Sequence, residues 1–246
     1  MKKIILLIFS TFSLSAFAQE QDATISSSSE TEESNSQETT SDFRPSAGDI
    51  SLELQFEPFG DNPIDINGIR ARFFSSQRKA FRLNVFLGVD VDTDITQQAN
   101  PDVDLLELKD RTSVVTVNIR PGYEWHTKGT ERLSPYFGFE VDFAIQTSRF
   151  RTEDQTGNNE INYTKFINDN GFYRLGLNAV AGLDYYFSKK IYLGAEFGFG
   201  ASVTRLLDQR VDSDFPGFEE PDPINRGGSF DLGPNVNVDI RLGYVF

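Results

Sequence analysis

The chain has 246 residues, enough for one large or two small domains. It has no cysteine and a single histidine, His126, which excludes disulfides, thiolate metal sites, cysteine nucleophiles and a polyhistidine metal site. Acidic residues outnumber basic ones by 37 to 23, which argues against nucleic acid as a partner, and the mean hydropathy is below that of a helical membrane protein.

The N-terminus predicts a signal peptide over residues 1–18. A basic start at Lys2 and Lys3 precedes an apolar run from Ile4 to Leu14, and Ala16 to Ala18 form a small-residue cleavage site. The alternative, a membrane-anchoring helix, needs a longer apolar run.

Residues 19–47 predict a disordered acidic tail. The segment consists mainly of Ser, Thr, Glu and Gln, with seven acidic residues and one basic residue, Arg44. Its few apolar side chains cannot offset the entropy lost on ordering. We expect a solvated spacer, with a binding tail as the alternative.

From Gly48 to Phe246, apolar and polar residues alternate in eight segments, which predicts eight β-strands. Most segments have ten or more residues, whereas strands of soluble proteins have about five or six. Eleven residues rise about 36 Å, or about 26 Å when tilted near 45°, which matches the apolar band of a membrane β-barrel. The strands are expected at about 50–57, 65–75, 81–91, 115–125, 137–146, 173–185, 191–203 and 232–246.

The connections between these segments alternate in length. Short turns are expected at 76–79, 127–133 and 188–190, and long polar loops at 92–110, 151–170 and 207–228, with a shorter loop at 59–64 on the long-loop side. Bacterial outer-membrane barrels have short periplasmic turns and longer external loops. An even number of strands then places both termini on the short-turn side.

Aromatic residues gather beside the expected short turns, as an aromatic girdle does at a membrane surface. Core aromatics of a soluble sandwich are the alternative. The residues are Tyr123, Trp125, Phe137, Tyr185, Phe187, Tyr244 and Phe246.

One face of the predicted sheet is charged. An eight-stranded barrel is just wide enough for side chains to fill it, and buried charges must be paired. We therefore expect a lumen plugged by ion pairs, with a gated pore as the alternative. The expected inward charges are Arg70, Arg72, Arg82, Arg120, Arg174 and Arg241, with Glu53, Glu57, Asp90, Glu124, Glu140, Asp142, Asp184, Glu196 and Asp239.

The three long loops carry most of the excess acid. Within them and just before them, Asp90, Asp92 and Asp94 have the oxygen ligands that Ca²⁺ prefers, but the glycine and the terminal glutamate of an EF-hand loop are missing. Solvated loops, bridged to lipid by divalent cations, are the favoured interpretation.

The C-terminal residues Val238 to Phe246 alternate apolar and polar side chains and end in phenylalanine. This run is similar to the terminal strand that the barrel assembly machinery reads. With the signal peptide, residues 48–246 resemble the outer-membrane protein β-barrel domain family, the small OmpA/OmpX-like barrels of Gram-negative bacteria. That family has no universal catalytic residues, so we predict no catalytic, cofactor-binding or metal-binding residue and no cofactor.

The sequence thus predicts an all-β, eight-stranded antiparallel up-and-down transmembrane β-barrel of the outer membrane, with a disordered N-terminal tail and a non-enzymatic structural or partner-binding role. The expected partners are outer-membrane lipid and lipopolysaccharide, the barrel assembly machinery during insertion, and a protein at the extracellular loops. Three alternatives remain: a narrow channel, a lipid-modifying enzyme, and a soluble lipocalin-like barrel. The enzyme is disfavoured because His126 falls at the periplasmic end, away from the outer leaflet.

Overall fold

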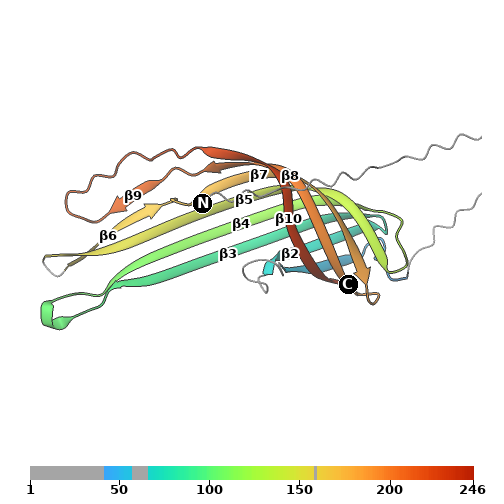
Figure 1. Cartoon of the computed structure of the whole chain (residues 1–246), viewed down its shortest axis with the longest axis horizontal. Coiled ribbons are helices and arrows are strands. Elements are labelled where there is room, and N and C mark those ends of the chain that lie inside the picture. Colours follow the sequence, from blue (N-terminus) through green and yellow to red (C-terminus); the bar gives the residue numbers. More distant parts are fainter. Residues whose placement is uncertain (1–41, 57–65, 158–159) are drawn as a thin grey trace, which may run out of the picture. The chain divides into compact units, whose positions relative to one another are not determined.

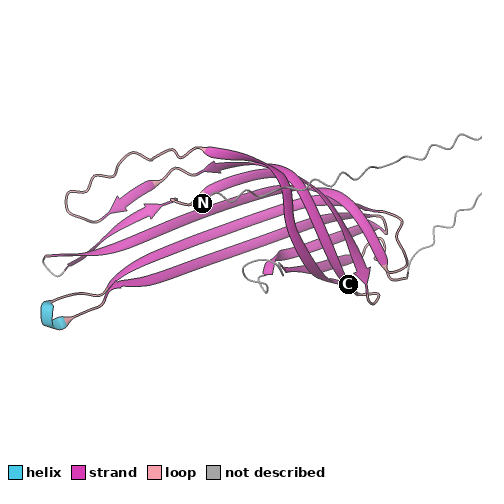
Figure 2. Ribbon diagram, in the orientation of Figure 1, coloured by secondary structure: helices cyan, strands magenta, loops and turns pink. Residues whose placement is uncertain are grey.

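The computed structural model describes residues 42–56, 66–157 and 160–246, all within one compact unit, Thr39–Phe246. These residues form an antiparallel β-structure with one short 3-10 helix (Figures 1 and 2). Within the described ranges, no helix has the length and hydropathy needed to cross a membrane. The strands are β1 (Ile50–Phe56), β2 (Ile66–Ser76), β3 (Lys79–Gln97), β4 (Leu108–His126), β5 (Leu133–Thr156), β6 (Glu160–Ile167), β7 (Phe172–Tyr186), β8 (Ile191–Leu206), β9 (Arg210–Ser213) and β10 (Gly228–Val245), and the helix η1 is Pro101–Val103.

Eight of these strands form a closed hydrogen-bonded ring. Its order is β1, β2, β3, β4, β5, β7, β8 and β10, and β10 returns to β1 with Leu52 opposite Tyr244. Closure pairs the backbone groups that an open sheet leaves free at its two edges. The predicted eight-stranded antiparallel sheet is confirmed as this ring. The tight connections after β2, β4 and β7 lie at one end of it, which we call the short-turn end.

The predicted long loops were partly wrong, because strands continue into them. β3 and β4 have 19 residues each and β5 has 24, and β6 and β9 lie inside the expected loops 151–170 and 207–228. The reason is that apolar alternation stops where the outer face becomes polar, whereas backbone pairing does not need apolar side chains. We call this polar part of the sheet the extension. It comprises residues 90–97, 108–114 and 147–156, with β6 and β9.

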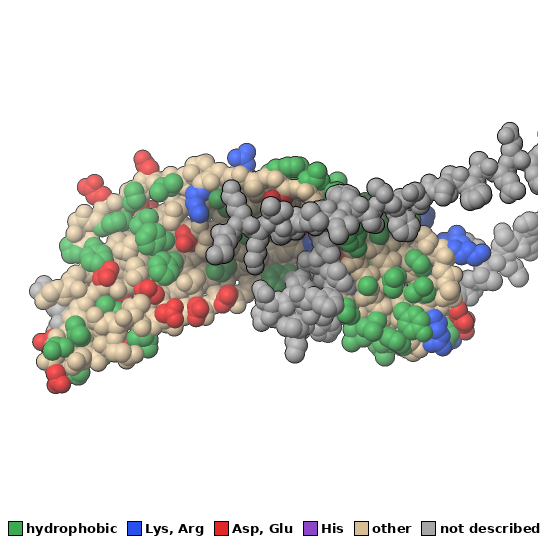
Figure 3. Space-filling view, viewed as in Figure 1, with side chains coloured by type: hydrophobic (Ala, Val, Ile, Leu, Met, Phe, Trp, Pro, Cys, Tyr) green, Lys and Arg blue, Asp and Glu red, His purple; other side chains and the backbone are tan. Residues whose placement is uncertain are grey.

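The apolar face of the ring is its outside and the charged face is its inside. Leu87, Val89 and Leu177 are 69%, 68% and 59% exposed. By contrast, Arg72 and Arg82 are 0% exposed. Hydrophobic side chains are visible over the outer surface in Figure 3. Alternation alone did not reveal which face is inside, and this burial shows that the soluble lipocalin-like alternative, with apolar residues inside, is wrong.

The outward apolar side chains form what we call the apolar belt. On β4 it runs from Val115 to Trp125, eleven residues, which span about 26 Å when a strand is tilted near 45°. The predicted aromatic residues lie at its short-turn end, where neighbouring rings pack together. Ring centroids are 4.9 Å apart for Tyr123 and Trp125 and 5.6 Å for Trp125 and Phe137. The pairs Tyr185–Phe187 and Tyr244–Phe246 are 5.2 and 4.9 Å apart.

Candidate functional site in the lumen of the ring

The lumen holds a cluster of arginines and carboxylates drawn from all eight ring strands. Strand alternation directs every second side chain inward, so the charged face of each strand meets the others there. The side chains of the cluster are between 0 and 8% exposed. We call it the lumen cluster, and its members are Glu53, Arg70, Arg72, Arg82, Glu124, Glu140, Asp184, Glu196 and Arg241.

Arg72 contacts three carboxylates of the cluster. Its Nε lies 2.7 Å from Oε1 of Glu53 and 3.1 Å from Oε1 of Glu124. Its Nη1 donates to Oδ2 of Asp184 at 2.6 Å. All four side chains are fully buried. A buried guanidinium is tolerated only when such charged partners replace its water.

The remaining arginines join these acids into one network. Arg82 donates to both carboxylate oxygens of Glu196 at 2.7 Å and to Glu140 at 3.0 Å. Arg241 donates to Glu53 at 3.2 Å and to Asp184 at 3.0 Å. Because single acids bridge two or three arginines, the ion pairs stabilise one another.

Two further pairs lie toward the extension. Arg120 is 3.6 Å from Glu140, and Nε of Arg174 is 2.7 Å from Oδ2 of Asp142. With them, six arginines face six carboxylates, so the described charges of the lumen balance. The structure confirms these twelve expected inward charges. Asp90 does not join them, because it is exposed on β3. Glu57 lies outside the described residues, and so does the side chain of Asp239.

Three buried tyrosines close the lumen beneath the arginines, and we call Tyr136, Tyr186 and Tyr192 the tyrosine layer. The Tyr136 hydroxyl donates to Glu196, and the Tyr192 hydroxyl donates to Glu53 at 2.6 Å. The guanidinium carbon of Arg72 lies 5.1 Å from the ring centroid of Tyr136. Sequence reasoning missed these residues. Their signal was available, since each stands at an inward position near a short turn.

Small residues make room for these bulky groups. A Cβ at Gly194 would lie 2.5 Å from both Nη2 of Arg241 and Oδ1 of Asp184. A Cβ at Gly182 would lie 2.5 Å from the hydroxyl oxygen of Tyr136. Both glycines therefore allow the lumen cluster to pack densely.

His126 ends β4 at the short-turn end, as expected, and faces inward with 4% exposure. Its Nδ1 lies 2.9 Å from Oγ of Ser134, and its Nε2 lies 3.2 Å from Oε1 of Glu124. Serine, histidine and a carboxylate also form the relay of many hydrolases. Here, however, Ser134 is 1% exposed and Glu124 is paired with Arg72, so no substrate reaches the hydroxyl. Ser134, His126 and Glu124 therefore form buried polar contacts within the lumen.

The chain segment before β1 covers the tyrosine layer from the short-turn end. Phe43 packs against the cluster of Tyr186, Tyr192 and Val245. Nη2 of Arg44 donates to the carbonyl oxygens of Thr130 at 2.5 Å and Leu133 at 2.8 Å. Partial burial lowers the pKa of the Arg44 guanidinium. The disordered tail was expected to reach Ala47, but the structure describes residues 42–47, and Phe43 and Arg44 make the contacts given above. Residues 19–41 of the expected tail lie outside the described residues.

The calcium hypothesis for Asp90, Asp92 and Asp94 finds no support. In the described part of the chain, no group of three His, Cys, Asp or Glu side chains could hold a metal ion. The physical reason is the strand itself, which separates alternate residues by about 6.6 Å, so their carboxylates run parallel and do not converge.

These features define a class: a closed antiparallel ring with an apolar outside and a charged, tightly paired inside. Residues 84–201, from β3 to β8 and just under half of the chain, match the model of the putative OmpA-OmpF-like porin family. This match confirms the resemblance to OmpA-like proteins that the sequence showed. A search of curated proteins finds no match for the chain.

Proposed function

We propose that this protein is an integral β-barrel of the bacterial outer membrane, with a structural or partner-binding role and no catalytic one. One observation carries the proposal: the apolar belt is exposed while the charges are buried. Soluble monomers rarely expose an apolar surface of such extent. The match to a porin-like family supports the same location.

The lumen favours a plugged barrel over an open channel. The arginines of the lumen cluster are all ion-paired, and the charges of the lumen balance once Arg120 and the Arg174–Asp142 pair are included. The tyrosine layer and residues 43–44 lie beneath the cluster. A plugged barrel would bind other molecules through its outer surface and not through its lumen. The extension offers such a surface beyond the outer leaflet, and an external protein partner would bind there. The assembly machinery would read the C-terminal strand β10 together with Phe246, which follows it.

A narrow channel is the second candidate, because the matching family is described as porin-like. Conductance of the purified protein in planar bilayers separates the two functions. We expect no sustained opening on the scale of a porin, and stable porin-sized steps would overturn the plugged barrel. A shift in gel mobility on heating the detergent-extracted protein tests membrane-barrel behaviour itself. Unchanged mobility, with the protein recovered in the soluble fraction, would refute the proposed function.

A further inference from the structure

Basic side chains of the extension gather on one of its two faces. The register places Arg111 opposite Arg151, and Arg151 opposite Lys165, so these side chains share one face of β4, β5 and β6. Arg149 lies on the same face, two residues before Arg151. It is the outer face, because Phe143 and Ile145 lie on it and are 50% and 48% exposed. We call Arg111, Arg149, Arg151 and Lys165 the outer row.

Most acidic residues of β3, β4 and β5 in the extension occupy the opposite face, whereas Glu153 on β5 and Asp212 on β9 share the outer face. Asp94 stands directly opposite Asp110, and the alternate positions of the strands place Asp90, Asp92 and Asp154 on the same side as that pair. The chain as a whole is acidic, with 37 acidic and 23 basic residues, so a basic outer face does not follow from composition.

The outer row begins directly above the apolar belt. On β4 the outward residues change from Val115 through Ser113 to Arg111. On β5 they change from Ile145 through Thr147 to Arg149. Each arginine is therefore the first outward charge on its strand. Each arginine is four positions along its strand from the last outward apolar side chain, which is about 10 Å in height on a strand tilted near 45°.

The row retains positive charge that the protein does not neutralise. Arg151 pairs with Glu153 at 3.2 Å, and Lys165 pairs with Asp212 at 2.9 Å. Arg111 and Arg149 are exposed, and neither side chain forms an ion pair or hydrogen bond with another described residue. Like charges directly opposite each other, such as Arg111 and Arg151, destabilise a sheet. An anion between them would remove that cost.

We infer that the outer row binds the phosphate groups of lipid headgroups in the outer leaflet. This inference rests on the proposed function, which places the row at headgroup level. Guanidinium forks match phosphate oxygens in pairs, and such charge-assisted bonds are among the strongest in proteins. The occupant is a phosphorylated glycolipid of the lipopolysaccharide type, whose acyl chains lie along the apolar belt.

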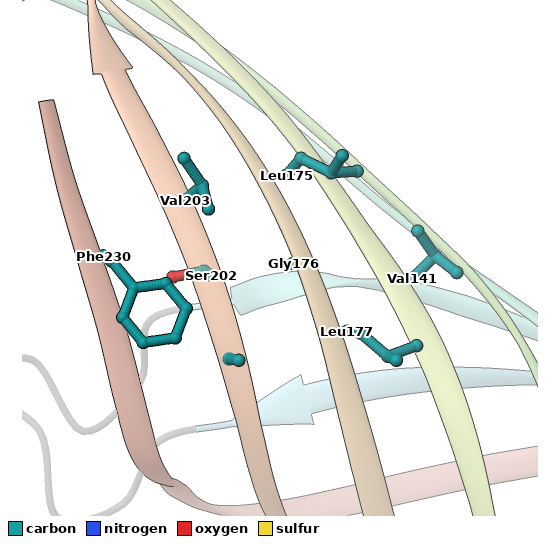
Figure 4. Close-up of a pocket in the computed structure, with 8 residues that line it drawn as sticks. Val141, Leu175, Gly176, Leu177, Ser202, Val203 and Phe230 are labelled. Atoms are coloured by element: carbon teal, nitrogen blue, oxygen red, sulfur yellow. The ribbon is translucent and has the colours of Figure 1, made fainter.

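An open hollow on the outer face of the neighbouring strands suits such acyl chains (Figure 4). It has a volume of about 300 Å³. Arg205 follows two residues after Val203 on the same outward face of β8 and is exposed, so a further cation stands beside the hollow. The lining side chains include Val141, Leu175, Leu177, Ala201, Val203 and Phe230.

The test compares two double variants of the full chain, folded in detergent. Arg111→Gln with Arg149→Gln removes the two unpaired charges of the row. Lys128→Gln with Lys190→Gln removes the same charge from exposed positions at the short-turn end and is the matched control. Native mass spectrometry measures the binding of bisphosphorylated lipid A and of its dephosphorylated form.

We expect the wild type and the control to prefer the phosphorylated lipid, and the Arg111/Arg149 variant to lose about tenfold in affinity for it. Equal affinities in all three proteins would overturn the inference. Displacement of the lipid by equimolar inorganic phosphate would overturn it too, because it would indicate a site for a soluble anion. Heat-shifted gel mobility in every protein shows that the barrel is folded. If heating does not shift the gel mobility of the wild type, the proposed function itself is refuted.

Discussion

Replacement of Arg72 by methionine tests whether the lumen cluster holds the ring together. Methionine keeps most of the side-chain volume and removes only the charge and its donors. Three carboxylates then lose a partner, because Arg72 lies 2.7, 3.1 and 2.6 Å from Glu53, Glu124 and Asp184. All of these side chains are 0% exposed, so water cannot replace the guanidinium.

The expected loss in the free energy of unfolding is about 3–5 kcal/mol, the usual effect of breaking a buried ion pair on one side. Glu53 and Asp184 keep Arg241 at 3.2 and 3.0 Å, which limits the loss to the lower part of that range. Adding Asp184→Asn restores the charge balance. The double variant is expected to recover about 0.5–3 kcal/mol relative to the sum of the single effects.

Urea unfolding in phospholipid vesicles measures these differences, and the single tryptophan, Trp125 on the outer face of β4, provides the fluorescence signal. Arg226→Met, at an exposed position between β9 and β10, is the control and should lie within about 0.5 kcal/mol of wild type. If Arg72→Met also lies within 0.5 kcal/mol, then the lumen is hydrated and the reasoning from burial fails.

Three further outcomes are expected. Leu177→Arg places a charge in the apolar belt and should lower the free energy of unfolding by about 2–4 kcal/mol in vesicles. The control Leu105→Arg, between β3 and β4, should leave the free energy of unfolding nearly unchanged. Equal effects of the two changes would contradict the proposal that the apolar belt faces lipid. Arg44→Ala removes the donor to two carbonyl oxygens, so amide hydrogen exchange in the 127–132 turn should become faster; unchanged exchange would show that the contact is not formed. Titration of the folded protein with Ca²⁺ in a calorimeter should give no binding heat, and a saturable heat would restore the calcium hypothesis.

Alternation in the sequence was sufficient to predict the eight ring strands and which residues share a face. It did so because a strand's side-chain period is two whatever its surroundings. The same alternation does not tell which of the two faces lies inside. Only the closed ring of the structure showed that Arg72 is buried and Leu87 is exposed. β6 was missed because the end of β5 with which it pairs has a polar outer face, and β9 was missed because it has only four residues and pairs with a distant segment, β6.

The floor of the lumen could not be predicted for a different reason. Tyr186 and Tyr192 flank one turn, but the contact with Phe43 joins them to a segment more than 140 residues earlier. Arg44 likewise meets carbonyl oxygens 86 and 89 positions later in the chain. Backbone carbonyls are present at every residue, so no composition or spacing marks the two that accept these bonds.

The closing contact between the first and last ring strands bears on how the chain folds. Arg241 on β10 reaches Glu53 on β1 across 188 positions, the same distance in sequence over which the ring must close. Until the final strand docks, Glu53 lacks one of its cations and the sheet has two free edges. The pairing of Glu53 with Arg241 and the closure of the ring thus occur in the same step. A nascent chain that still lacks β10 can neither form this ion pair nor close the ring. Such long-range pairing is slow, and it couples the formation of β1 to that of β10.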